Sequence, residues 1–321
     1  MNATDDQPTV GTRFCVAAAF ALVAFAVCWR AQYVAHALGG DHLMIWRAAH
    51  IVLDGGDPYK LMWPMELPAL HTAFNYPLPA IGMGLPFVWL RQQDAAIAFA
   101  TCSAALLGFV LTKNDLSRVP MILSVPFWFT AQLAQTSAVI LAFALVREAG
   151  ALTAMKPNIG LALFAWRPTW RTVILGGGFV AGTIIISPEW LPQWLHLTQI
   201  SPTHHAPVRS VIGALPLLAI ARWRRPEARL LIAMTLIPHG LYFYDELPLW
   251  LVAQTQTESM LLGGFSWVGW LGWLVASDGR LGQAAPWIIA SLYLPCLVMI
   301  LRRPNEGETP ELITRIVERF R

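Results

Sequence analysis

Residues 14–29 read FCVAAAFALVAFAVCW and contain no charged side chain. A membrane-spanning helix needs about 20 mostly apolar residues to cross about 30 Å of hydrocarbon, and this segment continues to about Leu38. Arg13 precedes it, and it lacks the small-residue ending of a signal-peptide cleavage site. We therefore expect the first transmembrane helix here, and no cleaved signal peptide.

The whole chain is similarly apolar. Of its 321 residues, 56% are hydrophobic and 13% are charged, with a mean hydropathy of +0.52, which is too apolar for a soluble protein to cover with polar surface. Further uncharged runs cover residues 67–90, 95–112, 172–188, 230–244, 259–277 and 281–301, and shorter ones cover 210–221 and 247–257. The run 119–146 holds Pro120, Pro126, Gln132 and Gln135, which favours two short or broken helices. These runs predict an all-α polytopic membrane protein with about 10–12 transmembrane helices.

Basic residues in short loops predict the orientation, because cytoplasmic loops are enriched in Lys and Arg. One side can collect Arg13, Arg91, Arg167, Arg171, Arg222, Arg224, Arg225, Arg302 and Arg303. With that side cytoplasmic, residues 39–76 and 188–208 form two long outer loops. Residues 1–303 are then one transmembrane domain in a bacterial plasma membrane, with both termini cytoplasmic. Residues 304–321 are expected to form an amphipathic helix on the cytoplasmic surface, where a membrane protein partner could bind.

The first outer loop contains Gly-Gly-Asp twice, at 39–41 and 55–57. Arg47, His50 and Asp54 are spaced three and four residues apart, which predicts an interfacial helix over 41–54 with these side chains on one face. Asp41 stands where a helix N-cap belongs. Gly55 or Gly56 would end the helix in the left-handed conformation, and Asp57-Pro58 would begin a turn.

Several short motifs carry a resemblance. An Asp after the first apolar segment, then Leu53, Gly55, Asp57, Pro58 and Tyr59, then Tyr-Pro-x-Pro at 76–79, resemble glycosyltransferase family 87. This family contains polytopic GT-C enzymes that use polyprenyl-phosphate sugars, among them mannosyltransferases and arabinofuranosyltransferases. Ala134-Gln135-Thr136-Ser137 resembles its Gly-Gln motif with Ala in place of Gly, and Lys156-Pro157 and Tyr244-Asp245 resemble later motifs. The resemblance covers about residues 14–300, in a chain that is short for the family.

The resemblance implies a GT-C-like fold and an inverting transfer of a sugar, with mannose expected, to a lipid or glycan acceptor on the extracytoplasmic side. Asp41 matches the family's catalytic Asp and would take the acceptor proton as general base. Cations would stabilise the departing phosphate; the candidates are Lys156, Arg209, His204 and His205. Candidate sugar or acceptor residues are Asp57, Tyr59, Asn75, Tyr76, Gln135 and Asp245. No metal or cofactor is expected, since the chain contains no Asp-x-Asp pair.

Simpler interpretations stay open for most of these residues. Asp41 and Asp57 could serve only as a cap and a turn, Lys156 could reach the interface from a hairpin tip, His204 and His205 could be a solvated pair, and Asp245 could mark the interface. A catalytically silent relative acting as a membrane subunit of a larger complex is the alternative function, and a transporter is a weaker one. Nothing in the composition favours nucleic-acid binding.

Overall fold

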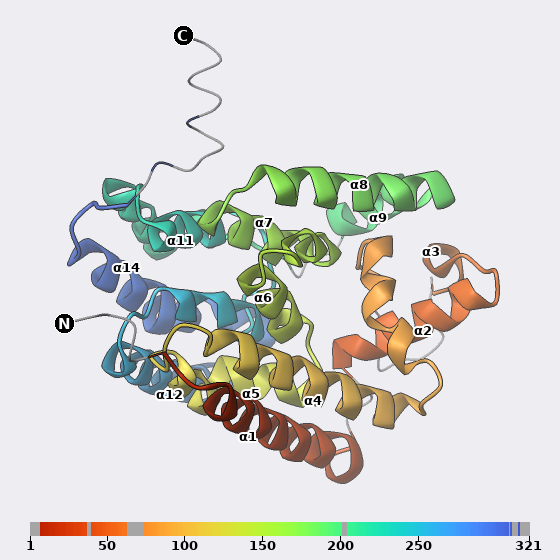
Figure 1. Ribbon diagram of the computed structural model, residues 1–321, viewed down its shortest axis with the longest axis horizontal. Helices are drawn as coiled ribbons and strands as arrows, with labels where there is room; N and C mark the ends of the chain where they lie inside the picture. Colours follow the sequence, from red (N-terminus) through yellow and green to blue (C-terminus); the bar gives the residue numbers. More distant parts are fainter. Residues whose placement is uncertain are drawn as a thin grey trace.

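The computed structural model describes residues 7–36, 40–62, 74–200, 204–307, 309 and 314 (Figure 1). Within these residues the chain is helical, with one isolated backbone bridge between His205 and His239 and no strand. The expected all-α class is therefore confirmed. The expected amphipathic helix at 304–321 lies almost entirely outside the described residues.

The α-helices are α1 (Val10–Trp29), α2 (Gly40–Leu53), α3 (Pro58–Leu61), α4 (Gln92–Leu111), α5 (Val125–Gln132), α6 (Ser137–Leu145), α7 (Pro157–Trp166), α8 (Trp170–Ile186), α9 (Trp190–Ile200), α10 (Val211–Ala214), α11 (Pro226–Leu236), α12 (Gln256–Ser277), α13 (Ala285–Ile288) and α14 (Leu294–Leu301). Short 3-10 helices connect them at Leu78–Met83, Leu85–Phe87, Val119–Leu123, Gly150–Met155, Pro207–Arg209, Leu215–Arg222, Tyr244–Leu251 and Leu281–Gln283. Two π-helical turns, Arg30–Val34 and Ile289–Tyr293, extend α1 and join α13 to α14.

Three described helices are long and apolar enough to cross a membrane, at Val10–Val34, Gln92–Leu111 and Gln256–Ser277. Two bent pairs, α5 with α6 and α8 with α9, raise the number to five if each pair is one span; their axes bend by 116° and 109°. Length and composition thus support fewer spans than the predicted 10–12. Prolines and 3-10 segments divide many of the uncharged runs, which leaves the shorter apolar helices Leu78–Phe87, Pro157–Trp166, Val211–Arg222 and Ala285–Leu301 among the described residues.

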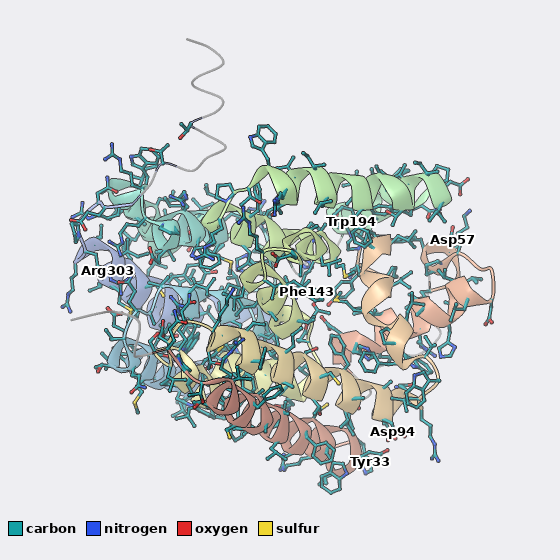
Figure 2. All side chains as sticks on the ribbon, viewed as in Figure 1. Tyr33, Asp57, Asp94, Phe143, Trp194 and Arg303 are labelled. Carbon is teal, nitrogen blue, oxygen red and sulfur yellow. The ribbon has the colours of Figure 1, made fainter. Side chains whose placement is uncertain are left out.

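Helices α1 and α4 pack side by side and run in opposite directions (Figure 1). At the beginning of α1, the Arg13 guanidinium donates to the Phe109 carbonyl at 3.2 and 3.1 Å, near the end of α4. Past the other end of α1, the Tyr33 hydroxyl donates to Asp94 Oδ1 at 2.5 Å, in the first turn of α4. Figure 2 shows Tyr33 and Asp94 far from Arg303, which lies near the end of the chain.

This packing corrects one sequence prediction. Arg91 directly precedes α4, so it lies at the end of the bundle opposite to Arg13, and not beside it as expected. The error comes from the run 67–90, which was counted as a membrane crossing. From residue 74 onward that run forms two short 3-10 helices, and the start of α4 lies beside the segment that follows α1, at the same end of the bundle.

Guanidinium groups bind the carbonyl ends of several helices at one end of the bundle, here called the arginine end. The donors and acceptors are Arg13 to Phe109, Arg118 to Leu251 and Ala253, Arg222 to Leu301 and Arg303, Arg229 to Ala165 and Trp166, and Arg303 to Val252. The last carbonyls of a helix have no partner within it and form the negative end of its dipole. These contacts therefore satisfy groups that an apolar environment would leave costly.

The opposite end, here called the loop end, holds α2, α3 and α9 (Figure 1). Gly55, with φ of +78°, ends α2 as expected, and Asp57 caps α3 by accepting the Tyr59 backbone N–H at 2.9 Å. Lys60 then joins α3 to the segment before α9, with its Nζ 2.8 Å from Glu189 Oε2 and 3.3 Å from Asp57 Oδ2. The two outer segments expected from the sequence thus contact each other directly.

Candidate functional site

Asp41 lies in the first turn of α2, at the loop end. The structure begins α2 at Gly40, so Asp41 is inside the helix and not at the N-cap as expected. Gly40 has φ of +56°, and a β-carbon there would lie 1.9 Å from the Leu133 carbonyl oxygen. Only glycine allows this contact, which brings Asp41 against the break between α5 and α6.

The carboxylate of Asp41 accepts a hydrogen bond from Tyr76. The Tyr76 hydroxyl donates to Asp41 Oδ2 at 2.8 Å, and the Tyr59 hydroxyl donates to the Tyr76 carbonyl at 2.8 Å. Burial raises the pKa of Tyr76 well above its ordinary value, and the charges of Asp41 and Asp245 act in the same direction. Tyr76 is therefore a neutral donor at physiological pH, and Asp41 and Asp245 lie in one electrostatic environment.

Lys156 and Asp245 form a buried ion pair. Lys156 precedes α7 and Asp245 is in the 3-10 helix Tyr244–Leu251; their Nζ and Oδ1 atoms are 2.5 Å apart, and the side chains are 7% and 3% exposed. Ser137 Oγ accepts from Lys156 at 3.2 Å and donates to Asp245 Oδ1 at 3.0 Å, while the Gly240 N–H donates to Asp245 Oδ2 at 3.2 Å. This burial excludes both simpler interpretations, a snorkelling Lys156 and an interface-marking Asp245.

His204 belongs to the same region. Burial lowers the pKa of His204 below its ordinary value, and the charges of Asp245, Lys156 and Asp41 also act on this pKa. His204 is therefore partly buried beside these groups and not simply solvated. We call Asp41, Tyr76, Lys156, His204 and Asp245 the interior polar cluster.

A second buried pair adjoins this cluster. His239 Nε2 lies 3.4 Å from Glu246 Oε1 and 2.8 Å from the Tyr293 hydroxyl, and His239 and Glu246 are 1% and 0% exposed. The His239 backbone pairs with that of His205, whose N–H donates to the His239 carbonyl at 3.1 Å. The segment 239–246, which contains Asp245, is therefore hydrogen-bonded at His239 to His205 of the second predicted outer loop.

Three residues with left-handed backbone converge around the cluster: Gly40, Ala134 (φ +46°) and Phe243 (φ +59°). Ala134 precedes Gln135, in the motif where the resembled family has glycine. Thr130 Oγ1 in α5 donates to the Tyr244 carbonyl at 3.4 Å, so the turns that hold Ala134 and Phe243 pack together. Non-glycine residues in this conformation cost roughly 1–3 kcal/mol each and concentrate at functional sites, which supports a functional interpretation of the cluster.

Other predicted site residues lie elsewhere or play structural parts. Asp57 caps α3 and accepts from Gln193 at 3.3 Å, which matches the turn interpretation. Asn75 accepts from Trp194 Nε1 at 2.9 Å through its backbone carbonyl. Arg209 and His205 are exposed, so neither is brought into the interior polar cluster.

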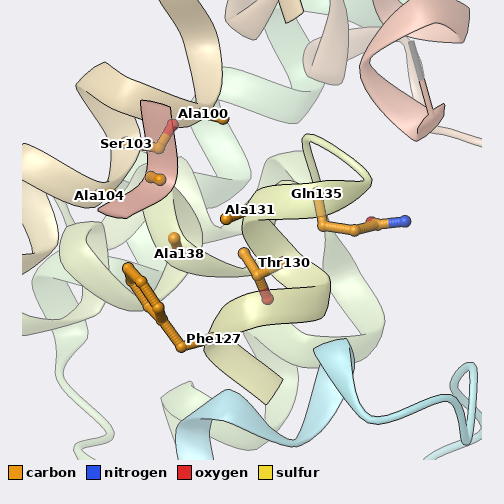
Figure 3. A pocket seen from close by; sticks show the side chains of 9 residues that line it. Ala100, Ser103, Ala104, Phe127, Thr130, Ala131, Gln135 and Ala138 are labelled. Carbon is orange, nitrogen blue, oxygen red and sulfur yellow. The ribbon is translucent and has the colours of Figure 1, made fainter. Parts of the chain in front are cut away.

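Gln135 lines a small pocket between α1, α4, α5 and α6. Figure 3 shows its side chain extending away from Phe127, while Ala100, Ala104, Ala131 and Ala138 give the pocket small walls. Gln135 is 2% exposed, and its Oε1 accepts no hydrogen bond from the described residues. Neither Asp41 nor Lys156 lines this pocket.

Sequence reasoning missed Ser137, His239 and Glu246 as members of this buried network. Ser137 closes the Ala-Gln-Thr-Ser motif, and Glu246 follows Asp245 at the end of an apolar run; two adjacent acids in such a position were the available signal. His239 was harder to find, because one of its two side-chain partners, Tyr293, is distant in the sequence. Among the described residues no group of three His, Cys, Asp or Glu side chains is arranged to hold a metal ion.

Comparisons with protein-family models, with curated proteins and with solved structures find no match for this chain. The candidate site therefore depends on its own geometry: a carboxylate held by a tyrosine, a buried ammonium paired with a second carboxylate, and a partly buried histidine.

Proposed function

We propose that this protein is a membrane glycosyltransferase that moves a sugar, most simply mannose, from a polyprenyl-phosphate donor to a lipid or glycan acceptor, with Asp41 as general base. The observation that carries the proposal is the Asp41 carboxylate, which is hydrogen-bonded to Tyr76 and lies in the same region as Lys156, Asp245 and His204. Charged groups inside a membrane protein are costly and mark functional sites. The motif resemblance supplies the reaction class.

The proposed step balances as a single displacement. The acceptor hydroxyl oxygen forms a bond to the anomeric carbon while the bond from that carbon to the phosphate oxygen breaks, and the electron pair of the broken bond remains on the phosphate. The acceptor proton passes to Oδ1 of Asp41, since Oδ2 accepts from Tyr76. Attack from the face opposite the leaving group inverts the anomeric carbon.

Negative charge grows on the phosphate oxygen in this step, so a nearby cation stabilises the transition state more than the ground state. The Lys156 ammonium has three donors, of which Asp245 and Ser137 take two. The third could bind a phosphate oxygen. His204 is the second candidate, because it is partly buried and the charges of Asp245, Lys156 and Asp41 act on it.

The proposed orientation places the arginine end in the cytoplasm of a bacterial cell. Arg13, Arg118, Arg222, Arg229 and Arg303 gather there, as the enrichment of basic residues in cytoplasmic segments predicts. Asp41 would then face the extracytoplasmic side, where polyprenyl-phosphate sugars serve as donors for enzymes of the resembled type.

A catalytically silent membrane subunit is the second candidate. It is favoured by the ion pair of Lys156, because the buried ammonium already binds the Asp245 carboxylate. A phosphate would have to compete with this carboxylate. A purely structural role would use the pair only to hold α7 against the segment 239–246.

Reconstitution separates the two candidates. The purified protein is placed in liposomes with radiolabelled polyprenyl-phosphate mannose and membrane lipid extract, and label in new lipid or glycan products is measured. The proposal expects transfer that is lost in Asp41→Asn. Absence of transfer from mannosyl, arabinofuranosyl and glucosyl donors alike would favour the silent subunit.

A further inference from the structure

Tyr76 is held from several directions. Its ring is buried and lies 6.3 Å from that of Phe74, and its carbonyl accepts from the Tyr59 hydroxyl at 2.8 Å. The preceding carbonyl, of Asn75, accepts from Trp194 Nε1 of α9 at 2.9 Å. Pro77 follows and restricts the Tyr76 backbone to extended conformations. The hydroxyl oxygen of Tyr76 is therefore fixed by both outer segments of the loop end.

The one polar contact of that hydroxyl in the described residues is with Asp41 Oδ2, at 2.8 Å. Because a phenol hydroxyl has a single proton, donating it to Asp41 leaves the Tyr76 oxygen able only to accept from a sugar hydroxyl. While this hydrogen bond persists, Tyr76 can meet a sugar only as an acceptor, which differs from the donor role that would fix a sugar oxygen.

We propose that Tyr76 is a positioning residue, whose hydroxyl holds Oδ2 of Asp41 so that Oδ1 is directed at the acceptor hydroxyl. This inference rests on the proposed function, in which Asp41 is the base. Tyr76 keeps its proton throughout the reaction, and the acceptor proton goes to Oδ1. The hydrogen bond fixes the direction of the carboxylate, and with it the lone pairs of Oδ1 that receive the proton.

Other groups act on the same carboxylate. The titratable and charged groups that face this region are Tyr76, Lys156, His204, Tyr244 and Asp245. Tyr76 is the member that donates a hydrogen bond to Asp41. Removing its hydroxyl should therefore act on Asp41 directly, while leaving the ion pair of Lys156 and Asp245 in place.

The test measures kcat and the KM of the donor for sugar transfer by the full-length protein in liposomes. For Tyr76→Phe, we expect kcat to fall roughly 10- to 100-fold, the range for a hydrogen bond to a charged group, with little change in the KM of the donor. Tyr76→3-fluorotyrosine preserves the shape of the side chain and keeps the hydroxyl donor, so it should restore most of the wild-type kcat.

Tyr33→Phe is the matched control, because it removes a hydrogen bond of the same kind, from a tyrosine hydroxyl to the Asp94 carboxylate, away from the interior polar cluster. Its kcat should equal that of the wild type. An unchanged kcat in Tyr76→Phe, with transfer still abolished by Asp41→Asn, would overturn the role of Tyr76 alone. Full transfer by Asp41→Asn would instead contradict the proposed function.

Discussion

Gly40 and Gly55 share a left-handed backbone but differ in their surroundings. A β-carbon on Gly40 would lie 1.9 Å from the Leu133 carbonyl oxygen, whereas one on Gly55 would meet nothing within 4 Å. We expect Gly40→Ala to destabilise the protein by about 3 kcal/mol or more, from overpacking added to backbone strain, and to disturb Asp41. Gly55→Ala should cost only about 1 kcal/mol of strain.

The two variants are compared with the wild type by thermal unfolding in detergent and by the transfer assay. Gly55→Ala should unfold slightly earlier than the wild type and keep its transfer activity, while Gly40→Ala should lose both stability and transfer. Equal effects of the two substitutions would mean that the contact between α2 and the α5–α6 break does not form.

Some residue-level features could be predicted from the sequence and others could not. Gly55 and Asp57 follow local rules for helix ends, and the structure confirms both. The same rules predict an N-cap at Asp41, but Asp41 lies inside the first turn of α2 and accepts a hydrogen bond from Tyr76, which is distant in the sequence. A pattern within one short segment cannot reveal such a partner.

At the scale of the elements, the buried pair of Lys156 and Asp245 holds the beginning of α7 against the segment 239–246. Asp245→Asn alone would leave a buried ammonium without its counter-charge, so we expect a loss of about 3–5 kcal/mol. The double variant Lys156→Met with Asp245→Asn removes both charges and should recover most of that stability. Transfer should stay lost in the double variant, because the phosphate would still lack its ammonium.

A double-mutant cycle on the free energy of unfolding, with the transfer assay in parallel, separates the effect of the pair on stability from its effect on transfer. Recovery of transfer together with stability would show that the pair is structural only and that Lys156 does not bind the phosphate.

The helix pattern was predicted best where the sequence itself contains the boundaries. The prediction of a helix over 41–54 agrees with α2 (Gly40–Leu53), and the prediction of two short helices in 119–146 agrees with α5 and α6. The run 67–90 was interpreted wrongly as a crossing, because uncharged composition alone does not distinguish a spanning helix from buried 3-10 turns. Pro77, Pro79 and Pro86 were the signals against a continuous helix.

At the scale of the whole molecule, the position of Arg91 distinguishes the structure from the sequence-based topology. The sequence placed Arg91 with Arg13, whereas the structure places it at the loop end with α2. Single cysteines at Asp54, Arg91 and Arg224, all exposed positions, test this in a background without the native cysteines. In intact spheroplasts, a membrane-impermeant maleimide should label Asp54→Cys and Arg91→Cys, and Arg224→Cys only after permeabilisation.

Labelling of Arg91→Cys together with Arg224→Cys, and opposite to Asp54→Cys, would restore the sequence-based topology and contradict the antiparallel packing of α1 and α4. Labelling of all three positions from outside would instead reveal damaged membranes, which a cytoplasmic marker enzyme controls for.

The central claim is that Asp41 is the base of a sugar transfer. Its most direct test compares wild type, Asp41→Asn and Asp54→Asn for the transfer of label from polyprenyl-phosphate mannose in liposomes. Asp54 is an exposed carboxylate at the far end of the same helix, so its variant controls for loss of charge. We predict wild-type transfer by Asp54→Asn and a loss of about 100-fold or more in Asp41→Asn, the contribution typical of a general base. Equal transfer by all three proteins would contradict the claim.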